Sequence, residues 1–156
     1  MSLKKRIEED IKTALRARDR QRTGVLRMLK AKLQEAEIAL RSRQNPDAEL
    51  DEQAATRVIA AYGKQRRESI ASYREAGREE LAVKEEAELA VVIDYLPAQL
   101  DDAAIRTRVK EAVAASGATS LKDLGAVMKA AMANLQGAAE GKRVQRIARE
   151  LLSGSD

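Results

Sequence analysis

The sequence predicts an all-α protein. Apolar residues recur every three or four positions along nearly the whole 156-residue chain, which is the spacing of one face of an α-helix. Proline, glycine and capping residues divide this pattern into segments, and no segment alternates as a half-buried strand would. The chain is 44% hydrophobic and contains three Tyr but no Phe or Trp, so we expect a core of Leu, Ile, Val, Ala and Met.

Two helical segments are predicted before the first proline. Ser2 is placed to cap the first, whose apolar residues recur every four positions. These residues are Leu3, Ile7, Ile11 and Leu15. The stripe of the second segment consists of Val25, Leu26, Leu29, Leu33, Ala36 and Leu40, and it ends before the Asn45-Pro46 turn. The two stripes do not lie on one face of a single straight helix, which indicates a break at Asp19 or Thr23, although a single bent helix also fits.

The next two helices lie between Pro46 and Pro97. The third has Ala55, Val58, Ile59, Tyr62, Ile70 and Tyr73 on one side. Gly77 suits its C-terminus, because glycine adopts the left-handed conformation that often ends a helix. The fourth runs from about Arg78 to Tyr95 and directs Leu81, Leu89, Val92, Ile93 and Leu96 inward. Pro97 ends it, because proline lacks the backbone N–H that a helix needs.

Three shorter helices are predicted after Pro97. Asp101 or Asp102 caps a segment bearing Ile105, Val109 and Val113, which Gly117 closes. Ser120 and Asp123 have the spacing of a capping box and open the next segment. Its apolar residues are Leu124, Val127, Met128, Met132 and Leu135. Gly137 and Gly141 bracket a turn before the last segment, whose apolar residues are Val144, Ile147, Leu151 and Leu152.

The positions of these capping and helix-ending residues predict two domains. Residues 1–97 form an N-terminal helical domain of about four helices, and residues 98–156 form a small three-helix domain. The four-residue spacing never becomes a sustained heptad pattern, so we do not expect a long coiled coil.

Positive charge is concentrated near the N-terminus. Residues 1–32 contain eleven Lys or Arg and four Asp or Glu, a net charge of +7. Residues 33–100 have a net charge of −5 and residues 101–156 one of +2. This asymmetry favours either a polyanionic partner or contact between oppositely charged segments, and a solvated Arg-rich helix face explains it equally well.

The composition excludes several kinds of chemistry. With no Cys and no His, the chain has no disulfide, no thiolate nucleophile and no zinc or haem site that needs those ligands. No apolar run is long enough to span a membrane, and the first ten residues lack the apolar region of a secretory signal. We therefore expect a cytoplasmic protein with no cofactor, no metal and no catalytic residue.

Two motifs that could suggest a ligand are better explained structurally. The segment from Gly137 to Lys142 resembles a phosphate-binding loop, but it has three residues between its glycines, lacks the following Ser or Thr, and follows no strand. We interpret it as a connection between helices. An acidic cluster contains Glu79, Glu80, Glu85, Glu86, Glu88 and Asp94. We interpret this cluster as a solvated face that could also complement the basic first helix.

The basic residues near the C-terminus carry more functional information. Lys142, Arg143, Arg146 and Arg149 have spacings that can share a helix face, and the first two follow a turn at a helix N-terminus, which favours an anion. Contact of Lys and Arg with phosphates is largely independent of sequence. Because aromatic residues are scarce, any RNA would be recognised by its backbone and shape.

Several segments resemble the YqeY family of small bacterial helical proteins. They are Tyr95-Leu96-Pro97-Ala98-Gln99-Leu100, the preceding Lys84–Leu89, Gly117–Met128, and the opening residues Leu3, Ile7, Asp10 and Val25–Leu29. The C-terminal part of this family is similar to the tail domain of GatB, the tRNA-binding subunit of glutamine-dependent tRNA amidotransferase. That tail contacts the body of tRNA, while the chemistry occurs elsewhere in the enzyme. The resemblance thus implies a GatB/YqeY architecture and an association with carbon–nitrogen ligation that uses glutamine as amide donor.

The chain departs from the family pattern around Gly125. The family usually has methionine and lysine where this chain has Leu124 and Ala126, and aspartate where it has Glu140. Lys122 and Lys129 are near enough to replace the missing lysine. We interpret Gly125 as a small residue that permits close packing of helices.

The sequence therefore predicts an RNA-contacting accessory protein whose partner is tRNA or another RNA. The candidate phosphate contacts are Lys122, Lys129, Lys142, Arg143 and Arg146, assisted by the basic first helix. An amidotransferase or another protein is a possible second partner. A stand-alone enzyme of amide transfer is not expected, since no activated nucleophile is recognisable. The alternative is a protein–protein adaptor that uses the charged N-terminal helices without binding RNA.

Overall fold

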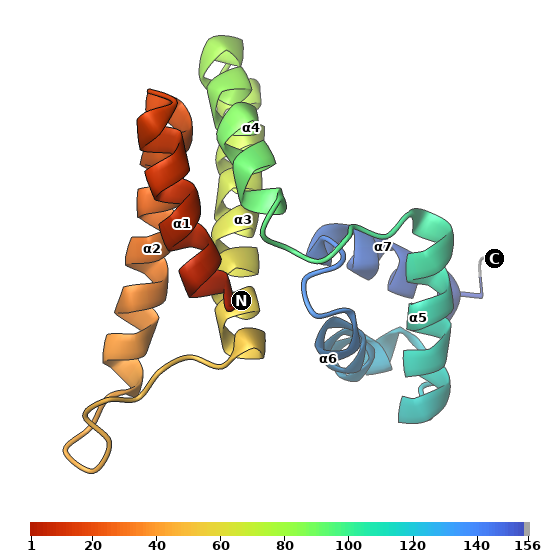
Figure 1. Cartoon of the computed structure of the whole chain (residues 1–156). Helices are drawn as coiled ribbons and strands as arrows, with labels where there is room; N and C mark the ends of the chain where they lie inside the picture. The colour runs from red at the N-terminus through yellow and green to blue at the C-terminus, as the bar shows by residue number, and fades with distance from the viewer. Residues whose placement is uncertain (155–156) are drawn as a thin grey trace. The chain divides into compact units, whose positions relative to one another are not determined.

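The structure is a computed structural model that describes residues 1–154, and it confirms the all-α prediction. Every regular element in this range is helical and no strand occurs in it. The chain divides into two compact units, Met1–Leu96, here called the N-terminal unit, and Pro97–Asp156, the C-terminal unit (Figure 1).

The first two helices form a helical hairpin. Helix α1 spans Leu3–Arg16 and α2 spans Arg20–Leu40. The predicted cap at Ser2 is confirmed, since its side chain accepts a hydrogen bond from the backbone N–H of Lys5. The predicted break lies at Asp19, whose carboxylate accepts a hydrogen bond of 2.9 Å from the backbone N–H of Arg22 and so caps α2.

The turn between α1 and α2 has an unusual residue at its left-handed position. The backbone N–H of Asp19 bonds to the carbonyl of Ala14 and that of Arg18 bonds to the carbonyl of Leu15, the two hydrogen bonds of a Schellman motif. Glycine is the usual residue at the next-to-last position of this motif, but here Arg18 occupies it with φ of 57°. A side chain in this conformation costs about 1 kcal/mol relative to glycine.

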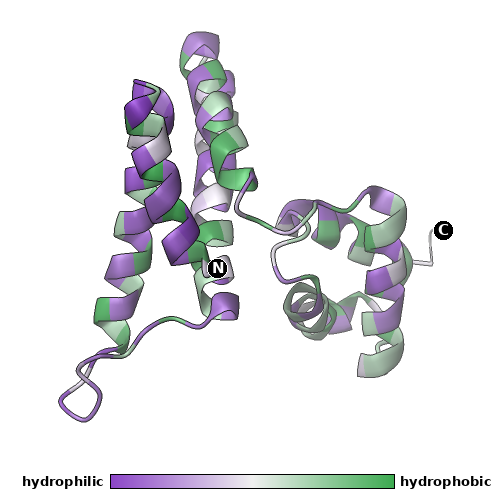
Figure 2. Cartoon of the chain, in the orientation of Figure 1, coloured by the Kyte–Doolittle hydropathy of each residue, from purple (hydrophilic) through white to green (hydrophobic). Residues whose placement is uncertain are grey.

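Two longer helices complete the N-terminal unit. Helix α3 spans Glu52–Glu75 and α4 spans Glu79–Ile93, and they pack against each other and against α2. The fully buried core consists of Ile7, Leu26, Leu29, Leu33, Ile59 and Val92. Hydrophobic residues alternate with hydrophilic ones along all four helices, as helices with one buried face require (Figure 2).

Three details of the predicted helices are wrong. Leu15 and Leu40 are about half exposed, because each lies at the end of its helix, beyond the packed part of the stripe. Ala14 is buried in the place expected of Leu15. Helix α4 ends at Ile93, two residues before the predicted end, and the buried Tyr95 instead donates a hydrogen bond to the carboxylate of Asp10 on α1.

The C-terminal unit contains three α-helices and one short 3₁₀ turn. Helix α5 spans Asp102–Ser116, the turn η1 spans Leu121–Asp123, α6 spans Leu124–Leu135 and α7 spans Gly141–Leu152. Asp101 caps α5, and Gly117 ends it with φ of 67°. The predicted capping box is confirmed: the Ser120 hydroxyl accepts a hydrogen bond from the backbone of Lys122, and the Asp123 carboxylate accepts one from the backbone of Ser120.

The core of this unit is entirely aliphatic. Its fully buried larger residues are Ile105, Val109, Val127, Val144 and Ile147. The segment before α5 is held to the turn between α6 and α7, because the amide of Gln99 donates to the carbonyl of Gly137 and the backbone N–H of Leu100 donates to that of Ala138, both at 2.9 Å. Because Val144 and Ile147 are buried in this core, the opposite face of α7 is exposed to solvent.

Candidate nucleic-acid interface

The five predicted phosphate contacts lie on three elements of the C-terminal unit. Lys122 is in η1, Lys129 is in α6, and Lys142, Arg143 and Arg146 are in the first half of α7. All five are at least partly exposed to solvent. Two of them, Lys142 and Arg146, line one surface depression, and two, Arg143 and Arg146, bind one carboxylate.

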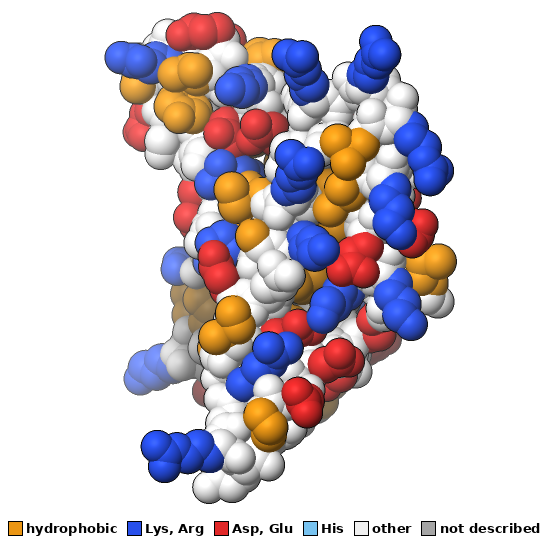
Figure 3. Space-filling view, turned by 60° about the vertical axis from the view of Figure 1, so that its left-hand side comes forward, with side chains coloured by type: hydrophobic (Ala, Val, Ile, Leu, Met, Phe, Trp, Pro, Cys, Tyr) orange, Lys and Arg blue, Asp and Glu red, His pale blue; other side chains and the backbone are white. Residues whose placement is uncertain are grey.

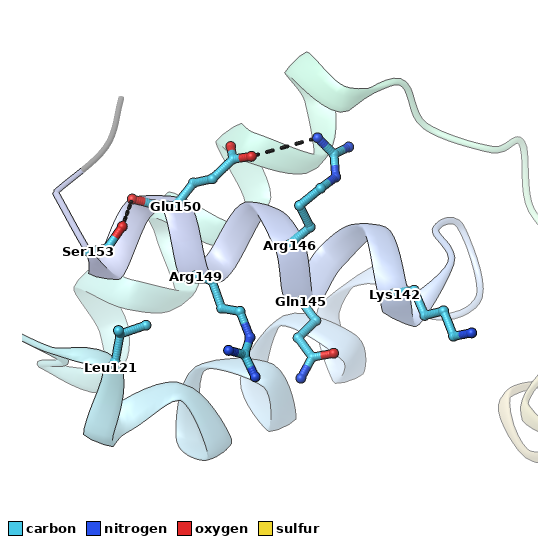
Figure 4. Close-up of a pocket in the computed structure, with 7 residues that line it drawn as sticks. All are labelled: Leu121, Lys142, Gln145, Arg146, Arg149, Glu150 and Ser153. Carbon is cyan, nitrogen blue, oxygen red and sulfur yellow. Dashed lines mark hydrogen bonds and ion pairs between the residues drawn. The ribbon is translucent and has the colours of Figure 1, made fainter.

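The depression lies between η1 and α7 and has a volume of about 450 Å³. We call it the η1–α7 depression. It is lined by Leu121, Lys142, Gln145, Arg146, Arg149, Glu150 and Ser153. Arg149 and Gln145 extend from α7 toward η1 and α6, whereas Arg146 and Glu150 extend toward α5 (Figure 4). Three cations and one carboxylate therefore surround an open surface, which suits an anion.

Asp102 neutralises part of this positive charge. Its carboxylate accepts hydrogen bonds of 2.6 and 3.1 Å from the Arg143 guanidinium and one of 3.0 Å from Arg146. The hydrogen bonds from Arg143 and then Arg146 hold the pKa of Asp102 below its usual value. Sequence reasoning missed this pairing, because Asp102 was interpreted only as a possible helix cap and the pair joins α5 to α7.

A second carboxylate continues the same network. Glu150 lies 2.6 Å from the Arg106 guanidinium on α5 and 3.7 Å from that of Arg146 on α7. The network of Asp102, Arg106, Arg143, Arg146 and Glu150 thus contains three cations and two carboxylates. Arg143 and Arg146 consequently serve first to join α5 to α7 and keep only part of their charge for an external anion.

Four exposed cations of η1, α6 and α7 have no such role. Within residues 1–154, no ion pair or hydrogen bond engages the side chains of Lys122, Lys129, Lys142 and Arg149. Arg149 was not among the predicted contacts. The signal was present in the sequence, since Lys142, Arg146 and Arg149 are spaced by four and three residues and so share a face of α7.

The interpretation of Gly125 as a packing residue is wrong. A methyl group added to its Cα would meet nothing within 4 Å in the described part of the chain, and the residue is exposed. Gly125 and Ala126 are instead two small, exposed residues of α6 that lie in sequence between Lys122 and Lys129. These two small exposed residues leave the backbone of α6 uncovered by larger side chains of their own between the two lysines.

The acidic cluster pairs mainly with α3. Glu79 and Glu86 lie 3.3 and 2.5 Å from Arg74, which raises the pKa of that arginine, and Glu85 lies 3.1 Å from Arg66. Asp94 does reach the first hairpin, where its carboxylate lies 3.5 Å from Arg22 on α2. The expected complement to the basic N-terminal helices therefore involves one acidic residue of the cluster, whereas Glu79, Glu85 and Glu86 join α4 to α3.

Within residues 1–154 there is neither a cluster of metal-binding side chains nor a membrane-spanning helix. No group of three Asp or Glu lies close enough together to hold a metal ion. None of the described helices is long and apolar enough to cross a membrane.

The fold and this surface define a class of small, all-helical proteins built from two compact units. Within that class the chain belongs to the YqeY family, because the family model described as Yqey-like protein matches residues 4–152, nearly the whole chain. The resemblance drawn from the Tyr95–Leu100 and Gly117–Met128 segments is thereby confirmed. No curated protein matches the chain.

Proposed function

We propose that this protein binds RNA, with tRNA as its main partner, through the exposed cations of the C-terminal unit. The observation that carries the proposal is that four exposed cations on η1, α6 and α7 have no intramolecular partner within residues 1–154. They are Lys122, Lys129, Lys142 and Arg149. An unpaired Lys or Arg on a surface gains most from a phosphate, because no existing ion pair has to be broken first.

The spacing of these cations suits a nucleic-acid backbone. Lys142 and Arg149 lie about 10 Å apart along the axis of α7, so that they can contact different phosphates. Arg143 and Arg146 lie between them and are held in place by Asp102. This pairing leaves the two arginines only part of their charge for phosphates, so that Lys142 and Arg149 carry the main contacts.

The absence of aromatic side chains determines the mode of recognition. Residues 97–156 contain no Phe, Tyr or Trp, so this unit cannot stack bases as single-strand-binding domains do. Recognition is therefore of the RNA backbone and of its shape. A folded RNA such as tRNA offers both.

The family supports the choice of tRNA. The C-terminal part of YqeY proteins resembles the tail domain of GatB, which contacts the body of tRNA in the amidotransferase. We accordingly propose that the protein is an accessory of amidotransferase systems. It would contribute RNA binding and no chemical step of its own.

Charge reversal on α7 tests the proposal. The variant Lys142→Glu/Arg149→Glu should bind tRNA at least about tenfold more weakly and show a shallower dependence of affinity on salt. The matched control is Arg108→Glu/Lys110→Glu, which changes the net charge equally on the exposed face of α5. Both variants must retain the helical circular dichroism of the parent. An equal loss in both variants would show only nonspecific attraction, and unchanged binding in the α7 variant would refute the proposed interface.

A further inference from the structure

The turn between α1 and α2 and the adjoining face of α2 form a second unusual surface. We call it the α1–α2 corner. It contains a depression of about 230 Å³ bordered by Leu15, Arg18, Arg20, Gly24 and Arg27. A groove of about 450 Å³ shares Arg20 and Gly24 with it and extends to Met28 on α2 and to Lys84 and Glu88 on α4. The two hollows therefore form one continuous surface of the N-terminal unit.

Arg18 occupies this surface at a cost to the fold. Its left-handed backbone, with φ of 57°, is one that glycine adopts more easily. Its side chain makes no hydrogen bond or ion pair within the described residues, so nothing inside the chain accounts for an arginine there. Residues kept in an unfavourable conformation without an internal partner are characteristic of functional surfaces.

Nothing within the described residues requires a glycine at position 24 either. It lies inside α2, where alanine would form a more stable helix, and a methyl group on its Cα would meet nothing within 4 Å. Its backbone does not need glycine either, because its φ is not positive. A glycine at an exposed helix position does, however, let another helix pack closely against it.

The charge and apolar content of the corner indicate what packs there. Arg18, Arg20 and Arg27 line the smaller depression and have no side-chain partner within residues 1–154. These three cations outnumber the one carboxylate of that depression, Asp19, which favours an acidic partner. Leu15 and Met28 expose 49% and 45% of their surface on either side of Gly24. Apolar side chains gain little from a phosphate backbone but bury well against the apolar face of a helix. Arginine and methionine are also enriched in protein interfaces, whereas lysine is depleted.

The side of the N-terminal unit that carries α1 and α2 is turned forward in Figure 3. Lys and Arg side chains crowd its upper part, and hydrophobic side chains lie between them. We infer that the α1–α2 corner binds an acidic amphipathic helix of a partner protein, with Leu15 and Met28 against its apolar face and the unpaired arginines against its carboxylates. Gly24 lies where the two helices cross most closely.

A synthetic peptide tests this inference on the full chain. The probe is a labelled 18-residue helix-forming peptide with Leu along one face and Glu on the other, and its binding is followed by fluorescence anisotropy. A peptide of the same composition, with Leu distributed around the helix, is the control. We expect the amphipathic peptide to bind at least about tenfold more tightly than the scrambled one.

Two variants locate the site. Gly24→Leu should weaken binding of the amphipathic peptide about tenfold by blocking the close approach, and Arg18→Gly should weaken it about threefold while the fold becomes more stable. The matched controls are Ala61→Leu and Arg57→Gln on exposed positions of α3, which should change binding less than twofold. The variant Lys142→Glu/Arg149→Glu should bind the peptide normally, so that this test is independent of the proposed RNA interface.

Three results would overturn the inference. The first is equal binding of the two peptides, which would show attraction by charge alone. The second is unchanged peptide binding in both corner variants. The third is a loss of tRNA binding, without a loss of peptide binding, in Arg18→Gly and Gly24→Leu, which would assign the corner to RNA.

Discussion

Asp102, in the first turn of α5, accepts a hydrogen bond of 2.6 Å from the guanidinium of Arg143, which lies 41 residues further along the chain on α7. The same carboxylate accepts a hydrogen bond of 3.0 Å from Arg146. Asp102 therefore joins the two helices and at the same time removes positive charge from the surface that we propose binds RNA. The two effects predict opposite changes in stability and in affinity when this carboxylate is replaced.

The variant Asp102→Asn should bind tRNA about threefold more tightly than the parent and melt at a lower temperature. Affinity rises because two guanidiniums lose their competing carboxylate, and stability falls because the α5–α7 link is weakened. Glu111→Gln is the matched control, since it removes one exposed carboxylate from the same helix. The same gain in affinity in both variants would show that only net charge matters.

The Asp102 pairing should also appear in the dependence of stability on pH. Because its pKa is lower in the folded protein than in the unfolded chain, the pair contributes stability above the usual value of 3.8. This contribution disappears as the pH falls through the lowered pKa. Thermal melting of the parent should therefore decline more steeply at acid pH than that of Asp102→Asn. Parallel curves for the two proteins would contradict the assignment.

Replacing Arg18 with glycine should stabilise the fold by about 1 kcal/mol, because glycine adopts the left-handed conformation without the clash of a side chain. Gly117→Ala is the reciprocal test. Its φ is 67° and its surroundings are open, so only the conformational cost remains and a loss of about 1 kcal/mol is expected. Both values can be measured by urea unfolding. A destabilised Arg18→Gly would mean that the Arg18 side chain supports the turn.

Tyr95 should make the N-terminal unit sensitive to alkaline pH. Burial and then the hydrogen bond to Asp10 raise the pKa of its hydroxyl to about 12. In the unfolded chain the Tyr95 hydroxyl loses its proton near pH 10. The contribution of the protonated hydroxyl to the free energy of unfolding is therefore complete below pH 10 and is lost as the pH rises toward 12.

The variant Tyr95→Phe should lack this alkaline loss. It should also unfold with about 1 kcal/mol less free energy at neutral pH, because the hydrogen bond to Asp10 is removed. Absorbance of ionised tyrosine followed through the titration should lose its latest component in the variant. Retention of that component would assign the high pKa to another tyrosine.

Local signals predicted the helices well. Ser2 and Ser120 cap the helix and turn predicted for them, and the structure selects Asp19 and Asp101 from the two candidates that the sequence left open at each of those helix starts. Capping is predictable because it depends on residues only three or four positions apart. The exposure of Leu15 was not predictable from its spacing. It depends on where α1 stops packing against its neighbours, which is a tertiary property.

The candidate site was harder to predict than the fold. The types and positions of Lys142, Arg143 and Arg146 were evident, but their partners were not, because Asp102 reaches them only once α5 and α7 are packed. Gly125 was misinterpreted for the same reason, since only the structure shows that nothing packs on it. Sequence therefore identifies the charges, whereas the structure distinguishes the paired cations from those available to a ligand.

The most direct test of the central proposal is binding of labelled tRNA to the intact protein by fluorescence anisotropy, compared with double-stranded RNA of equal charge at two salt concentrations. We predict preferential binding of tRNA that persists near physiological salt, with a slope of log affinity against log salt of about −3 to −4, as about four phosphate contacts require. Equal binding of both RNAs that disappears with salt, or no binding to either, would contradict it.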